Sequence, residues 1–285
     1  MLFAAPWLAG LAVFIAYPVA ASLFYSFCAF DGIRPPRWIG LENYRRMLLE
    51  DDLFWKSLWN TLFMVGVGVP LGLVSALGMA LLLNQKLRGM AFYRTIYYLP
   101  SITPVVASSI LWMWLLNPDL GLVNLGLRAL GAAHPPGWLN DPAWAKPALV
   151  LMGLWGVGGA MVIYLAGLQD VPGALCEAAA LDGAGPLQRL RHVTLPLLSP
   201  VILFNLVMGL IGGFQYFTQA FVMTGGGPQD STTVYALHLF NQAFLDFKMG
   251  YASAMAWVLF VVTVLCAVAV FRTSARWVYY QGEAR

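Results

Sequence analysis

Long apolar stretches alternate with short polar segments along the 285-residue chain. Six of the stretches run for at least about 20 residues, enough to cross a hydrocarbon core as a helix, and none of them contains Asp, Glu, Lys or Arg. This pattern predicts an all-α integral membrane protein with six transmembrane helices in a single domain, residues 1–285. The predicted spans cover residues 4–27, 58–83, 96–116, 148–168, 201–223 and 251–271.

The first stretch could be either a cleaved signal peptide or a retained helix. No positively charged residue precedes it, and Phe24, Tyr25 and Phe27 near its end suit a membrane interface. We therefore predict a retained helix, kinked at Pro18.

The polar segments between the spans differ in character. Residues 41–49 are expected to form a short amphipathic helix, whereas residues 117–147 and 224–250 are rich in turn-forming residues. Residues 117–147 and 224–248 are the expected contacts for an external protein, because of their length and because both lie on the side opposite residues 84–95.

The composition supports a membrane protein and excludes other classes. Hydrophobic residues make up 60% of the chain and charged residues 10%, compared with about 25% charged in soluble proteins. The net charge of +3 is too small and too scattered to indicate nucleic-acid binding. The three cysteines show no CxxC or metal-ligand spacing, which favours buried apolar roles.

Basic residues near the span ends decide the orientation only weakly. Eight lie on each side, but the side that contains residues 84–95 has shorter loops and therefore a higher basic density. We predict that this side, which also holds both termini and residues 177–200, is cytoplasmic.

Residues 177–200, EAAALDGAGPLQRLRHVTLPLLSP, form the polar segment between the fourth and fifth spans. Residues 177–181 are good helix formers, residues 182–186 break the helix, and residues 187–193 can resume it as a second short helix. Gly183 or Gly185 could supply a turn residue with positive φ, and Pro186 suits the first position of the next helix.

No catalytic or energy-coupling motif is present in the sequence. It contains no phosphate-binding loop, no HExxH, no GxSxG and no charged residue inside a span, so we expect the energy source to lie on another chain. Uncharged polar groups do occur within the spans, and several in the fifth recur at helical spacing on one face. They could line a solute pathway or simply join helices through packing and hydrogen bonds. The candidate pathway residues are Trp155, Gly159, Asn205, Gly212, Gln215, Tyr216 and Gln219.

The segment that begins at Glu177 resembles the cytoplasmic coupling loop of binding-protein-dependent ABC importer permeases. In that family the pattern EAA is followed after two residues by DGA and about eleven residues later by LP, which residues 195–196 match here. Leu190 departs from the family, which commonly has an aromatic residue there. FYR at 92–94, MTGGGP at 223–228 and GYASA at 250–254 are similar to the carbohydrate-uptake branch, which handles maltose and glycerol-3-phosphate. The matching coupling residues are Glu177, Ala178, Ala179, Asp182, Gly183 and Ala184.

The resemblance implies a prokaryotic inner-membrane subunit that forms half of a translocation pathway and is not itself an enzyme. Its implied partners are a second permease, two ATPase subunits that bind ATP and Mg, and an extracytoplasmic solute-binding protein. The implied solute is a sugar, a polyol or glycerol-3-phosphate. The absence of Arg and Lys from the spans favours a neutral sugar.

Other interpretations of the sequence remain open. An ion-coupled secondary carrier would need no ATPase, and a sodium site built from backbone carbonyls would leave no charged residue in a span. A membrane-embedded enzyme is disfavoured because no catalytic constellation can be named. Residues 177–200 could also be only an amphipathic interfacial linker.

Overall fold

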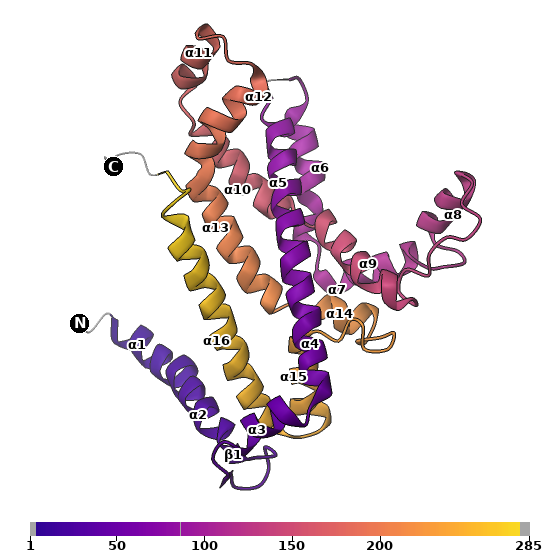
Figure 1. Ribbon diagram of the computed structural model, residues 1–285, viewed down its shortest axis with the longest axis vertical. Helices are drawn as coiled ribbons and strands as arrows, with labels where there is room; N and C mark the ends of the chain where they lie inside the picture. The colour runs from indigo at the N-terminus through magenta and orange to yellow at the C-terminus, as the bar shows by residue number, and fades with distance from the viewer. Residues whose placement is uncertain (1–3, 86, 280–285) are drawn as a thin grey trace.

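The computed structural model describes residues 4–85 and 87–279, which are mainly helical (Figure 1). Four helices are long and apolar enough to cross a membrane without a break: Ala5–Ser26, Asp52–Leu83, Pro186–Phe214 and Met249–Ser274. Two bent pairs of helices also qualify when each pair is counted as one span. This part of the chain therefore offers four continuous spans, or six if both bent pairs cross the membrane.

The first span consists of α1 (Ala5–Leu11), the π-helical turn η2 (Ala12–Ala16) and α2 (Tyr17–Ser26). Pro18 has no N–H to donate to the preceding turn, and the wider π turn directly before α2 accommodates that loss. The chain then forms a small antiparallel ladder in which β1 (Cys28–Ala29) pairs with β2 (Arg37–Trp38).

The short helix α3 (Glu42–Leu49) confirms the amphipathic helix predicted at residues 41–49. The second span then runs through α4 (Asp52–Phe63), the π turn η3 (Met64–Gly68) and α5 (Val69–Leu83). It begins at Asp52, earlier than the predicted residue 58. The earlier start follows from an N-cap, because the Asp51 side chain accepts a 3.1 Å hydrogen bond from the Phe54 backbone N–H.

The third predicted span is not a single straight helix. It consists of α6 (Met90–Ile102) and α7 (Val105–Leu115), whose axes differ by 99°. Thr103 between them is extended, as expected for a residue that precedes a proline, so the helix cannot continue through Pro104. The short helix α8 (Leu122–Ala129) follows and projects to one side of the bundle (Figure 1).

The fourth span is also bent, by 47°, between α9 (Pro142–Trp155) and α10 (Gly158–Gln169). A Cβ added at Gly158 would lie 2.5 Å from the Tyr97 carbonyl oxygen of α6. Glycine is therefore required here for the close approach of the two backbones.

The second half of the chain differs from prediction at the fifth span. The span predicted at 201–223 breaks after Phe214, because residues 215–217 leave the helix before α14 begins. The elements of this half are α11 (Gly173–Leu181), α12 (Pro186–Arg189), η4 (Leu190–Thr194), α13 (Leu195–Phe214), α14 (Thr218–Met223), α15 (Tyr235–Phe240), η5 (Asn241–Leu245) and α16 (Met249–Ser274).

Three apolar clusters hold the helices together. One joins α5, α10 and α13 around Ala76, Met161 and Tyr164; a second joins α9, α14 and α15; and a third joins α3, α4, α15 and α16 around Phe54 and Tyr251. The fold is elongated, with α11 and α12 at one end and β1 and α3 at the opposite end (Figure 1). The chain after α16 returns to the α11 end, where the Tyr279 N–H donates to Ser199 Oγ at 2.8 Å.

Candidate functional site

The turn after α11 has the geometry of a Schellman C-cap. The Ala184 N–H donates to the Ala179 carbonyl at 2.9 Å, and the Gly183 N–H donates to the Ala180 carbonyl at 3.1 Å. Gly183 adopts φ +85°, whereas Gly185 has φ −68°, so Gly183 is the positive-φ residue of the two candidates. The DGA sequence therefore ends the helix at a fixed angle.

The helix α12, which follows this turn, begins where the sequence predicts but does not end where expected. Gly185 is its N-cap, Pro186 occupies the first turn, and the Gln188 side chain accepts from the Gly185 N–H at 2.8 Å. Instead of a separate short helix, α12 continues through η4 into α13 as one 29-residue helix. The π turn before Pro196 accommodates the missing N–H of that proline, so the LP pair lies inside a continuous helix.

The surface of α11 has little contact with the rest of the chain. None of its residues is buried, and Glu177, Ala178 and Asp182 are exposed. Leu181 is 91% exposed and Leu187, just beyond the turn, is 76% exposed. Neighbouring apolar side chains left open to solvent are typical of a surface that contacts another protein or a membrane.

The structure brings some of the predicted pathway residues together. Asn205 lines a cavity of about 350 Å³ between α5, α10 and α13. Gly212 and Tyr216 line a cavity of about 170 Å³, and the two cavities share Gly68, Val69 and Gly72 as walls. The Tyr216 hydroxyl is buried and has no hydrogen-bond partner among the residues that the structure describes.

Other predicted pathway residues lie apart from these cavities. Because α13 ends at Phe214, Gln215 is its exposed C-cap and Gln219 belongs to α14, so the predicted continuous polar face of the fifth span is wrong. Trp155 contacts Trp112 edge to face at a centroid distance of 6.2 Å. A Cβ added at Gly159 would meet nothing within 4 Å.

Sequence reasoning missed a polar cluster at the end opposite α11. Asp51 Oδ2 accepts hydrogen bonds from the Tyr251 hydroxyl and, at 2.8 Å, from His238 Nε2. Burial alone would raise the pKa of Asp51, but the hydrogen bonds from Tyr251 and His238 outweigh it and hold that pKa below its ordinary value. The only sequence signal was Asp51 as a potential N-cap before an apolar helix.

The TGGGP loop is also fixed by contacts that the sequence did not reveal. Asn60 Nδ2 of α4 donates to the Asp230 and Thr233 carbonyls, each at 2.9 Å. Lys56 Nζ donates to the Gln229 carbonyl at 2.6 Å. The loop is therefore held rigidly against α4.

Residues 68–283 match the protein family described as "Binding-protein-dependent transport system inner membrane component". The chain is 43% identical over 284 residues to the probable ABC transporter permease protein YesP of Bacillus subtilis, covering 99% of this chain and 92% of that protein. It is 36% identical to the sulfoquinovosyl glycerol transport system permease protein SmoG of Agrobacterium fabrum, covering 92% of this chain and 85% of the relative.

A solved structure has a similar fold. It is the bacterial alginate ABC transporter in complex with an alginate pentasaccharide-bound periplasmic protein, with a TM-score of 0.85 and 22% identity over 96% of this chain and 93% of that one. The chain belongs to the binding-protein-dependent permease family. It is a permease subunit of an ABC importer, which confirms the prediction of a transport subunit rather than an enzyme.

Proposed function

We propose that the chain forms half of the translocation pathway for a sugar or related polyhydroxylated solute. The naming of SmoG for a sugar-containing solute and of the structural neighbour for an oligosaccharide supports this solute class. Asn205 and Tyr216 face neighbouring cavities and offer hydrogen-bonding groups in an otherwise apolar setting. Trp155, Gly159, Gly212, Gln215 and Gln219 remain predicted pathway residues.

The proposed energy source is a separate pair of ATPase subunits, which would bind ATP and Mg and contact α11. The observation that carries this proposal is the exposed surface of α11 joined through a rigid turn to a 29-residue helix. Glu177 and Asp182 would pair with basic groups, while Ala178, Ala179 and Ala184 would allow close approach. We further propose that the α11 end and both termini are cytoplasmic.

The remaining proposed partners are a second permease subunit in the membrane and an extracytoplasmic solute-binding protein. One chain supplies only one wall of a pathway, and many apolar side chains of α1, α2, α6 and α7 are exposed on its surface. The alginate transporter of similar fold was solved in complex with a periplasmic protein, which supports a binding-protein partner.

The coupling proposal can be tested by placing charge on the exposed apolar surface of α11. Leu181→Asp and Glu177→Lys are each reconstituted with the partner permease, ATPase and binding protein, and uptake is compared with ATP hydrolysis. We expect uptake to fall at least about tenfold, because one lost interfacial contact of about 1.4 kcal/mol corresponds to that factor. Leu130→Asp, which charges an 87% exposed leucine outside α11, is the matched control and should keep the wild-type ratio of solute transported to ATP hydrolysed. Full uptake by both α11 variants would refute the assignment.

A further inference from the structure

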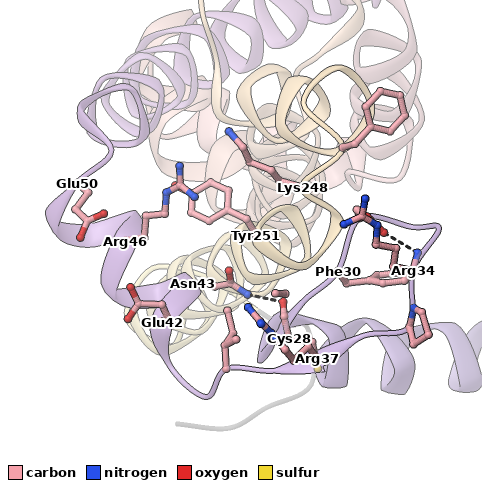
Figure 2. A pocket seen from close by; sticks show the side chains of 15 residues that line it. Cys28, Phe30, Arg34, Arg37, Glu42, Asn43, Arg46, Glu50, Lys248 and Tyr251 are labelled. Atoms are coloured by element: carbon pink, nitrogen blue, oxygen red, sulfur yellow. Dashed lines mark hydrogen bonds and ion pairs between the residues drawn. The ribbon is translucent and has the colours of Figure 1, made fainter.

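A cavity of about 710 Å³ opens at the end of the protein opposite α11. It is formed by the β1–β2 ladder, α3 and the beginning of α16, and most of its lining side chains are polar or charged (Figure 2). The hydropathy pattern assigns no role to this region. Arg34, Arg37, Arg46 and Lys248 contribute the positive charges of its wall.

The acidic residues of the wall already have basic partners. Arg45 donates to Glu42 at 2.9 Å and to Glu50 at 2.8 Å, and Arg34 lies 3.7 Å from Asp31. Arg34 therefore pairs with Asp31, and Arg45 is shared by Glu42 and Glu50, so each of the three carboxylates that line the cavity has a basic partner.

Two arginines are left without such a partner. Neither Arg37 nor Arg46 has a carboxylate within 4.0 Å in the described part of the chain, and Arg46 instead lies over the Tyr251 ring, 5.8 Å from its centroid. The N-terminus of α16 also borders the cavity, and its helix dipole adds positive potential. The cavity therefore favours an anionic group.

The cavity wall is held in a fixed shape. Buried Asn43 donates to the Ser26 carbonyl at 2.8 Å and to the Cys28 carbonyl at 3.0 Å. The Gly250 N–H donates to the Phe30 carbonyl at 2.9 Å, and a Cβ at Gly250 would collide with the Cys28 carbonyl oxygen. A preformed wall binds a partner without the entropy cost of ordering its own loops.

We propose that this cavity receives acidic side chains of the extracytoplasmic solute-binding protein, with Arg37 and Arg46 pairing to their carboxylates. The inference rests on the proposed function, which places this end outside the cytoplasm and supplies the partner. The volume exceeds what one carboxylate needs, so it suits an inserted acidic loop. Arginine pairs with carboxylates through two parallel hydrogen bonds, which fixes orientation as well as charge.

The test measures the binding-protein concentration that half-saturates ATPase stimulation of the reconstituted complex in lipid nanodiscs. Arg37→Glu and Arg46→Glu should each raise that concentration at least about tenfold at about 50 mM salt, and the difference should shrink at about 300 mM salt because ions screen the attraction. Basal ATPase activity and solute binding to the isolated binding protein should not change. Arg272→Glu, a charge reversal in the last turn of α16 and thus at the opposite end of that helix from the cavity, is the matched control and should keep the wild-type half-saturating concentration.

Folding defects and alternative ligands can be separated from the proposed docking. Arg37 is exposed on β2, and its guanidinium forms no ion pair within the described residues, so its reversal tests the proposal even if Arg46→Glu misfolds. A compensating Lys at an acidic residue of the binding protein should restore docking. If wild type shows stimulation and Arg37→Glu keeps the same half-saturating concentration, the inference is wrong. It is equally wrong if the variants respond only to the anionic lipid content of the nanodisc. If wild type itself is never stimulated, the proposed function fails instead.

Discussion

Asp51 should control how firmly the helix bundle is closed at the end opposite α11. Its carboxylate caps α4 and accepts hydrogen bonds from His238 and Tyr251, thereby joining the start of α4 to α15 and α16. Asp51→Ala removes all three contacts and leaves the almost fully buried His238 without its partner.

The expected cost follows from the individual contacts. Loss of an N-cap costs about 1 kcal/mol, and each hydrogen bond to a charged group about 1.5–3 kcal/mol. The Asp51 side chain is 18% exposed, so water can replace part of the lost hydrogen bonding. We therefore expect Asp51→Ala to lower the free energy of opening this end of the bundle by about 3 kcal/mol. Asp51→Asn keeps a capping oxygen but loses the negative charge, and should lower the same free energy of opening by about 1.4 kcal/mol.

Cys28 provides a reporter for this opening. Cys28 is completely buried, its thiol donates to the Phe24 carbonyl at 3.4 Å, and burial raises the pKa of that thiol, so labelling requires the end of the bundle opposite α11 to open. In a background with Cys176→Ser and Cys266→Ser, labelling by a disulfide reagent reports the open population. The costs above predict labelling roughly 150-fold faster for Asp51→Ala and about tenfold faster for Asp51→Asn.

A control variant and the pH dependence of labelling provide two further checks of the role of Asp51. Asp52→Ala, one residue later, removes a carboxylate that is exposed, and it should label at the wild-type rate. Because the folded-state pKa of Asp51 is lowered, its stabilisation is complete above the unfolded value of about 3.9 and is lost as pH falls through the folded value. The rate ratio of Asp51→Asn to wild type should therefore decrease towards one in acid. Equal labelling of wild type and Asp51→Ala at neutral pH would refute the reasoning.

Three further substitutions test close contacts of the fold. Gly158→Ala should reduce uptake and thermal stability, because its Cβ would meet the Tyr97 carbonyl, whereas Gly78→Ala in α5, where a Cβ would meet nothing within 4 Å, should be tolerated in both assays. Gly250→Ala should lower the melting temperature through a cost of about 1–3 kcal/mol, since its Cβ would press on the Cys28 carbonyl. Asn60→Leu removes the hydrogen bonds to two loop carbonyls and should lower the free energy of unfolding by about 2 kcal/mol. It should also make the TGGGP loop susceptible to limited proteolysis. Unchanged cleavage of that variant would show that the loop does not depend on this clamp.

Local features of the structure were predictable from sequence because their causes are local. The apolar periodicity of residues 41–49 indicated α3, and the DGAGP sequence indicated the turn that Gly183 makes. The breaks at residues 103–104 and 215–217 were missed because hydropathy is the same for a straight helix and a broken one.

The polar cluster and the cavity lined by Arg37 and Arg46 could not be predicted in the same way. Asp51, His238 and Tyr251 come from three segments that only the tertiary fold brings together, so no spacing rule relates them. Likewise, Arg45 pairs with both Glu42 and Glu50, and the neighbouring Arg46 has no carboxylate within 4.0 Å in the described part of the chain.

The unbroken helix from Pro186 to Phe214 has a mechanical consequence. At 1.5 Å per residue its 29 residues extend about 43 Å, and it packs against α5, α10 and α16 along its course. If a rod of this length pivots about its middle, a tilt of about 10° moves its two ends by about 4 Å in opposite directions. Displacement of Gly185 would then carry Phe214 and the Tyr216 cavity the other way, opening one mouth of a passage while narrowing the other.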